Sequence, residues 1–210
     1  MIDNLQLIKS LLNFEDKGDF YQLIILKRKK DQPQDQRDSH QSVRTIKTYC
    51  IESVEYLEKR YDEIKQLCEI FKARAYIHVQ KQNHADVSLD MMIDLAQRIK
   101  DGHNNQKNLF DSVVGQIKTK EKRWIVDVDT KDHLYLKKVI ECIEYLEPMV
   151  FKNLDTGETE SKIEAVIPTK NGFHLITKKF NVLEFKKKYP EIDIQKKNPT
   201  LLYLPNSLME

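Results

Sequence analysis

The stretch KRWIVDVDTKD, Lys122–Asp132, decides how the chain is interpreted. An apolar run over residues 124–126 leads into two aspartates, Asp127 and Asp129, which are separated by a single valine. Side chains alternate between the two faces of a strand, so residues two apart project together. The pattern therefore predicts a strand that turns its valines toward a core and presents both carboxylates on its other face.

Two carboxylates in this position indicate a site for a cation. Ionised carboxylates held side by side repel each other unless a positive charge lies between them. Hard divalent ions take oxygen ligands and leave positions for phosphate oxygens. Asp127 and Asp129 thus predict metal-assisted phosphoryl or nucleotidyl transfer. The structural alternative is an exposed strand end, with Asp129 or Asp132 capping the helix expected over 132–146.

The size and composition of the chain fit one globular domain. A chain of 210 residues and 24.9 kDa supports one well-buried core. With 40% hydrophobic and 32% charged residues it is too apolar to be disordered. We expect a single domain over 1–210. The net charge of +2 is too small to attract nucleic acid to the protein as a whole, although local clusters of basic residues can still do so.

The cysteines and the hydropathy pattern indicate a cytoplasmic protein. Cys50, Cys68 and Cys142 are odd in number and lack CxxC or Cys/His spacing, which argues against a disulfide framework or a zinc knuckle. No apolar segment approaches the roughly 18 residues that cross a bilayer, and the start of the chain lacks a signal-peptide pattern. We therefore expect no membrane partner.

Hydrophobic periodicity indicates an α+β fold. A hairpin with its loop around Pro33 precedes two amphipathic helices, and strands then alternate with helices from Trp124 onward. This order predicts a mixed or antiparallel RRM-like module over 116–210, preceded by an N-terminal αβ portion over 1–115. The expected helices cover 2–14, 53–71, 86–101, 132–146 and 182–189, and the expected strands cover 19–30, 43–51, 73–83, 123–129, 163–180 with a turn, and 201–205.

A second motif lies in IPTKNGFHLIT, residues 167–177. Lys170, Asn171 and Gly172 form a turn signal, because Asn and Gly tolerate positive φ. His174 follows on the next strand, where it can donate to a triphosphate together with Lys170, Thr169 and backbone N–H groups of the turn. The alternative is a partly buried histidine that bonds a carbonyl.

WIVDVD and TKNGFH together resemble the motifs of the archaeo-eukaryotic primase superfamily, the primase-polymerases, in their small phage or mobile-element form. The first motif of that family is an apolar strand ending in D-x-D or D-x-E, and its second is a turn leading to a histidine. The family usually has a serine and a basic residue before the histidine, where this chain has 169–171 as Thr-Lys-Asn. The third motif is a later carboxylate, for which Asp193 is the candidate, with Glu191 on the same face of the expected strand.

The resemblance implies a DNA primase or polymerase, a nucleotidyltransferase that binds NTP or dNTP on a DNA template in replication. Asp127, Asp129 and Asp193 would hold two Mg²⁺ or Mn²⁺ ions, and His174, Lys170 and Thr169 would bind the nucleotide. The resemblance covers roughly residues 123–205.

A run of four cations, Lys27, Arg28, Lys29 and Lys30, ends the first strand of the expected hairpin. On a nucleic-acid enzyme these side chains can follow template phosphates. Charge runs also serve as solvated edges that discourage strand pairing.

Two other functions stay open: a metal-dependent nuclease or phosphodiesterase that uses the same aspartates, and a non-catalytic protein that binds nucleotide or nucleic acid.

Overall fold

The computed structural model describes residues 1–32, 43–103, 109–116, 122–148 and 160–209. Helices and two sheets make up an α+β fold, which confirms the expected class. Every strand pair of these ranges is antiparallel, so the mixed sheet is not found there. The loop expected around Pro33 lies outside the described residues. No helix in these ranges is long and apolar enough to span a membrane.

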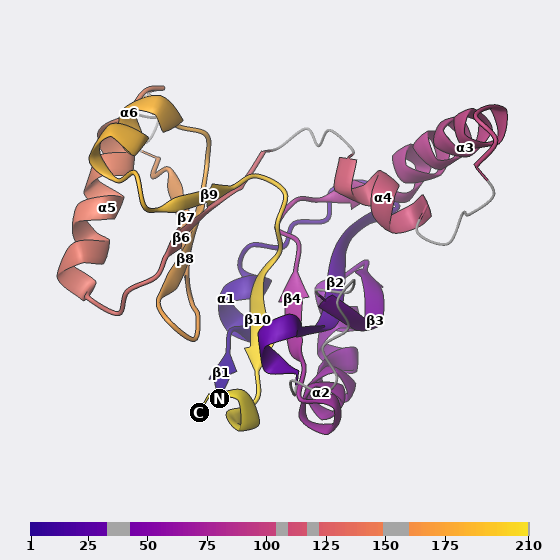
Figure 1. The fold of residues 1–210 in the computed structure, drawn as a ribbon, viewed down its shortest axis with the longest axis horizontal. Coiled ribbons are helices and arrows are strands. Elements are labelled where there is room, and N and C mark those ends of the chain that lie inside the picture. The colour runs from indigo at the N-terminus through magenta and orange to yellow at the C-terminus, as the bar shows by residue number, and fades with distance from the viewer. Residues whose placement is uncertain (33–42, 104–108, 117–121, 149–159, 210) are drawn as a thin grey trace.

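The first sheet combines the N-terminal half of the chain with its last strand. Its order is β1-β10-β4-β2-β3, and β5 pairs with one end of β2. Figure 1 shows the yellow β10 running between the indigo β1 and the magenta β4. Residues at the two ends of the chain therefore share one sheet. The strands are β1 Ile2–Asp3, β2 Asp19–Arg28, β3 Val43–Ile51, β4 Arg74–Ile77, β5 Gln82–Asn83 and β10 Thr200–Leu204.

Four helices accompany this sheet: α1 Leu5–Lys9, α2 Val54–Phe71, α3 His84–Lys100 and α4 Leu109–Gln116. Both ends of α2 are defined by their capping residues. The Ser53 side chain accepts a hydrogen bond from the Tyr56 N–H, and Lys72 ends the helix in the left-handed conformation. The apolar face of α2, with Leu57 and Ile64, packs on the sheet. The expected helix over 53–71 is confirmed.

The second sheet has the order β7-β8-β6-β9. Its chain order is strand, helix, strand, strand, helix, strand, and Figure 1 shows both helices on one side of it. β9 is short, and the chain leaves it to enter β10 of the first sheet. The elements are β6 Trp124–Val128, α5 His133–Tyr145, β7 Ile163–Pro168, β8 Phe173–Thr177, α6 Val182–Lys188 and β9 Asp193–Gln195.

Both faces of β6 are buried along much of its length. Val126 and Val128 pack with Leu175 against α5 and α6, as the alternation predicted. The opposite face is also apolar where it meets the first sheet, because Ile125 and Ile176 join the same core as residues of α2 and β2. Asp127 lies one step beyond Ile125 on this face, where the packing between the two sheets gives way to clefts.

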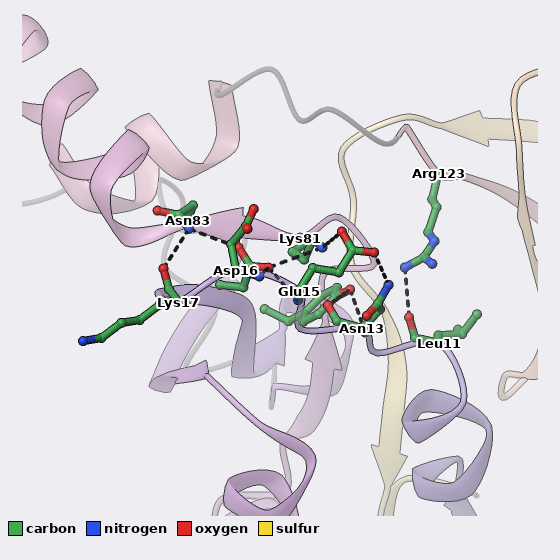
Figure 2. A network of polar contacts seen from close by, with 10 residues as sticks. Leu11, Asn13, Glu15, Asp16, Lys17, Lys81, Asn83 and Arg123 are labelled. Carbon is green, nitrogen blue, oxygen red and sulfur yellow. Dashed lines mark hydrogen bonds and ion pairs between the residues drawn. The ribbon is translucent and has the colours of Figure 1, made fainter.

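Arg123, just before β6, ties the two sheets together. Its Nη1 donates to the carbonyl oxygens of Leu11 and Val79 at 2.9 and 3.3 Å, and its Nε pairs with Glu164 at 2.6 Å. Figure 2 shows Arg123 at Leu11, beside a polar network in which Lys81 donates to Glu15 at 3.1 Å. These contacts fix the start of β6 relative to the first sheet.

Candidate functional site

Strand register brings three distant acidic and imidazole side chains side by side. Asp127 of β6 lies directly opposite His174 of β8 on one side and Asp193 of β9 on the other. Directly opposed residues in antiparallel strands have Cβ atoms about 4.5–5.5 Å apart. Three residues that were selected from separate motifs are thus neighbours across three strands, with Asp127 in the middle.

His174 is held from both sheets. Its Nδ1 lies 2.9 Å from the Thr200 hydroxyl of β10, and its Nε2 lies 3.5 Å from Oδ1 of Asp127. The residue is only 9% exposed. The pKa of His174 is lowered to about 4, mainly by burial; the Asp129 carboxylate opposes this shift and the Arg28 guanidinium contributes to it. The ring is therefore neutral near pH 7 and carries one N–H donor. Its hydroxyl partner differs from the carbonyl that we considered as the alternative.

Gln195 links the two carboxylates of β6 and β9. Its Nε2 donates to Oδ2 of Asp193 at 3.1 Å and to Oδ2 of Asp127 at 3.4 Å. An amide donor thus stands between two oxygen ligands, in the place where a cation would draw them together. Sequence reasoning missed Gln195, although it lies two residues after Asp193 and so shares its face of the strand.

The other acidic residues near β6 differ in their surroundings and contacts. Asp129 follows the strand and is exposed. Asp132 caps α5, accepting from the N–H groups of Leu134 at 2.8 Å and Tyr135 at 3.3 Å. Glu191 accepts a hydrogen bond from the Tyr135 hydroxyl at 2.5 Å, and it precedes β9 rather than lying on it. Of the two aspartates considered as helix caps, Asp132 is the one that caps.

Gly172 brings the two motifs into contact, by a different route from the one expected. Neither Asn171 nor Gly172 has positive φ, which among the described residues occurs at Gly18, Gly102 and Lys72. The reason for glycine here is close approach instead. A Cβ on Gly172 would lie 1.9 Å from the Val128 carbonyl oxygen, on the strand that carries Asp127.

The turn residues predicted to bind nucleotide are engaged within the protein. The Thr169 hydroxyl accepts from the Gly172 N–H at 3.1 Å, and the Thr169 N–H donates to the Gly172 carbonyl at 2.8 Å. Lys170 donates to the Leu208 carbonyl at 2.6 Å. The turn is therefore rigid, and both side chains border a cleft.

Two clefts meet at Asp127 and Asp129. The acidic cleft is about 290 Å³ in volume, and none of the described residues that line it is cationic. The basic cleft, about 140 Å³, lies between the two sheets and contains side chains from both. The acidic cleft is lined by Asp127, Val128, Asp129, Thr130, Asp132, Tyr135, Glu191, Ile192 and Asp193, and the basic cleft by Arg28, Arg74, Tyr76, Asp127, Asp129, Thr169, Lys170, Asn171, His174 and Leu201.

Of the four cations at the end of β2, Arg28 is the one that lines a cleft. Lys27 is half-buried and Lys29 is exposed, while the side chain of Lys30 lies outside the described residues. Arg74, which sequence reasoning missed, forms a bidentate pair with Asp31 at 2.8 and 2.6 Å. Arg28 makes no hydrogen bond or ion pair through its side chain to another described residue, so its guanidinium is available at the mouth of the basic cleft.

The carboxylate oxygens of Asp127, Asp129 and Asp193 are suitable ligands for a hard divalent ion, but they are not gathered around a single point. Within the described ranges, no group of three or more His, Cys, Asp or Glu side chains is placed so as to hold a metal. Asp129 and Asp193 are both exposed, and Asp193 lies opposite Asp127 in register. The donor chemistry of these three carboxylates therefore fits Mg²⁺ or Mn²⁺. Binding would need the Gln195 amide to release the pair.

Comparisons with known proteins add no assignment. No family model matches the sequence, and neither a curated protein nor a solved structure matches it. The resemblance to primase-polymerases accordingly remains a prediction from two short motifs.

Proposed function

We propose that this protein is a metal-dependent nucleotidyltransferase of the primase-polymerase type, which binds NTP or dNTP and acts on a DNA template. The observation that carries the proposal is the position of Asp127. This carboxylate stands between His174 and Asp193 in register and belongs to the walls of both clefts. Nucleotidyl transfer needs a cation site and a triphosphate site that meet at one point.

The connectivity of the second sheet supports the same proposal. The order β7-β8-β6-β9, with helices after the first and third strands, supports the prediction of a split βαβ or RRM-like unit. In that unit β6 and β8 are the two central strands, and they carry Asp127 and His174. The sequence portion 116–210 would then correspond to this unit together with β10, which returns to the first sheet.

Asp127, Asp129 and Asp193 would hold the Mg²⁺ or Mn²⁺. When bound, the metal would supply Lewis-acid stabilisation of the negative charge that develops at the phosphate. The protein's own contribution is to position oxygen ligands on adjacent strands. Gln195 keeps two of them paired through hydrogen bonds when no cation neutralises them.

The basic cleft would receive the triphosphate. Arg28 offers a guanidinium, which suits bidentate contacts with phosphate oxygens. His174 is neutral and fixed by Thr200, so its position is set before a ligand arrives. The small volume of this cleft fits the phosphates better than a whole nucleotide, whose sugar and base would extend outward.

The test is incorporation of labelled nucleotide on a primed and an unprimed DNA template, with Mg²⁺ or Mn²⁺. We expect the wild-type protein to incorporate nucleotide and the double variant Asp127→Asn with Asp193→Asn to lose all incorporation. Asp132→Asn is the matched control, because it removes an acidic group from the same cleft while asparagine keeps the helix cap. This variant should stay active.

Other outcomes select other functions. Shortening of the DNA without incorporation, lost in the same double variant, would assign a metal-dependent nuclease. Binding of Mn²⁺ and nucleotide without turnover on any template would assign a non-catalytic nucleotide-binding protein. If Mn²⁺ binds equally well to the wild type and the double variant, the proposed site is wrong.

A further inference from the structure

The outer face of α3 is apolar, and none of the described residues covers it. Leu89, Met92, Ile93 and Ile99 have 60%, 69%, 68% and 65% of their surface exposed. The opposite face of the same helix is covered, since Val87 packs in a core with residues of α4. Figure 1 shows α3 at the end of the molecule away from α5 and α6, with α4 on one side of it. Large side chains gathered in one exposed stripe indicate an interaction surface.

The spacing of this stripe is that of a coiled-coil seam. The exposed positions Ala85, Leu89, Met92, Ala96 and Ile99 follow one another at alternating steps of four and three residues. This is the a/d pattern by which one helix packs against another. The helix has 17 residues and is held in place by α4, so little ordering is needed before it binds.

The charges of α3 identify the partner. Asp86 and Asp90 lie in its N-terminal half, whereas Arg98 and Lys100 lie in its last turn. A parallel pair would place like charges together, while an antiparallel pair places the acidic half of each helix beside the basic half of the other. Arg98 already pairs with Asp94 of its own helix, which leaves Lys100 as the principal cation for this contact.

We propose that α3 pairs antiparallel with α3 of a second copy of this chain. The seam formed by Leu89, Met92, Ala96 and Ile99 is buried at the two-fold axis, and Asp86 of each copy lies near Lys100 of the other. A two-fold arrangement uses the same surface on both copies and closes at the dimer. Because α3 lies far from β6, both clefts of each copy stay open (Figure 1).

A nucleic-acid partner is disfavoured at this face. Asp86 and Asp90 would repel phosphates, and the exposed apolar side chains offer no compensating contact with a polyanion. Because the seam spans only about two heptads, we expect dissociation in the micromolar range.

The test is sedimentation equilibrium of the full chain over a range of concentrations. We expect a monomer–dimer equilibrium in the wild type. Met92→Glu should weaken the dimer by about tenfold or more, since it replaces one large buried side chain of each copy with a charge. Leu183→Glu is the matched control, because Leu183 is 78% exposed on the unrelated helix α6, and it should leave the equilibrium unchanged.

Charge exchange tests the antiparallel direction. Asp86→Lys alone should weaken the dimer, and Asp86→Lys combined with Lys100→Asp should restore it. A chain that stays monomeric at every concentration, or a dimer equally sensitive to Met92→Glu and Leu183→Glu, would overturn the proposal. Failure of the double exchange to restore the dimer would overturn the antiparallel arrangement. None of these results depends on nucleotide incorporation, so the two proposals fail independently.

Discussion

The two clefts that share Asp127 differ in charge and in origin. The acidic cleft is lined by residues 127–130, 132, 135 and 191–193, all of them from the second sheet and its connections. The basic cleft needs both sheets, because Arg28 and Arg74 come from the first and His174 from the second. The proposed cation site therefore lies within one unit, whereas the proposed phosphate site lies where the two units meet. The following predictions separate the two.

Asp127→Asn should have the largest effect, because this side chain belongs to both clefts. We expect loss of Mn²⁺ binding in calorimetry and a fall in nucleotide incorporation of about a thousandfold, or about 4 kcal/mol.

Asp193→Asn should weaken Mn²⁺ binding while leaving metal-free nucleotide binding unchanged, since Asp193 lines only the acidic cleft. Equal loss of both ligands in Asp193→Asn would contradict the separation of the clefts.

Gly172→Ala should move the wall of the basic cleft away from β6. The added methyl group would lie 1.9 Å from the Val128 carbonyl and 2.7 Å from the Thr130 nitrogen, and backbone atoms cannot rotate aside. We expect a loss of about 3 kcal/mol in the free energy of unfolding, measured by urea denaturation. Gly115→Ala is the control, because a Cβ there meets nothing within 4 Å, and it should be neutral or stabilising by up to about 1 kcal/mol.

Acidification should destabilise the protein through His174. Its pKa is about 4 in the folded state, against 6.5 for an unperturbed histidine, so the unfolded chain binds the proton more readily. Stability is present above pH 6.5 and is lost as the pH falls toward 4, by about 2–3 kcal/mol from this group.

The variant His174→Asn, whose amide can still bond Thr200, should lose less stability across that window. His78 has the same lowered pKa of about 4, so both proteins should still lose some stability as the pH falls. Thermal denaturation between pH 7 and 4 measures the difference. Parallel curves for the two proteins would show that His174 does not contribute.

Arg28→Ala should have the smallest effect and act on the basic cleft alone. We expect nucleotide affinity to fall by about tenfold, the value of one charge-assisted contact with a phosphate, while Mn²⁺ binding stays unchanged. Lys29→Ala is the control, because Lys29 is an exposed neighbour that borders neither cleft. Equal effects of the two substitutions would indicate a general loss of positive charge instead of a defined contact.

Local sequence patterns predicted helices and strands of the fold and pointed to the carboxylates of Asp127 and Asp129. The alternation in WIVDVD was enough to place Val126 and Val128 toward a core and Asp127 on the other face, because a strand has a strict period of two. Asp132 was one of two cap candidates before α5 and is the one that caps it; such a cap is open to prediction because capping is a contact between near neighbours in the chain. The turn at 169–172 was also found, although its glycine serves close packing.

Only the tertiary structure decided what surrounds Asp127. The register of β6 with β8 and β9 sets His174 and Asp193 beside it, and pairing register depends on long-range contacts that no local pattern encodes. The return of β10 to the first sheet brings Thr200 to His174, and the approach of the two sheets brings Arg28 to the same cleft. The sequence alone determined the strand and turn patterns that single out Asp127 and His174 as candidates, because alternation and turn signals are local. Their assembly into one site followed from the packing of the two sheets.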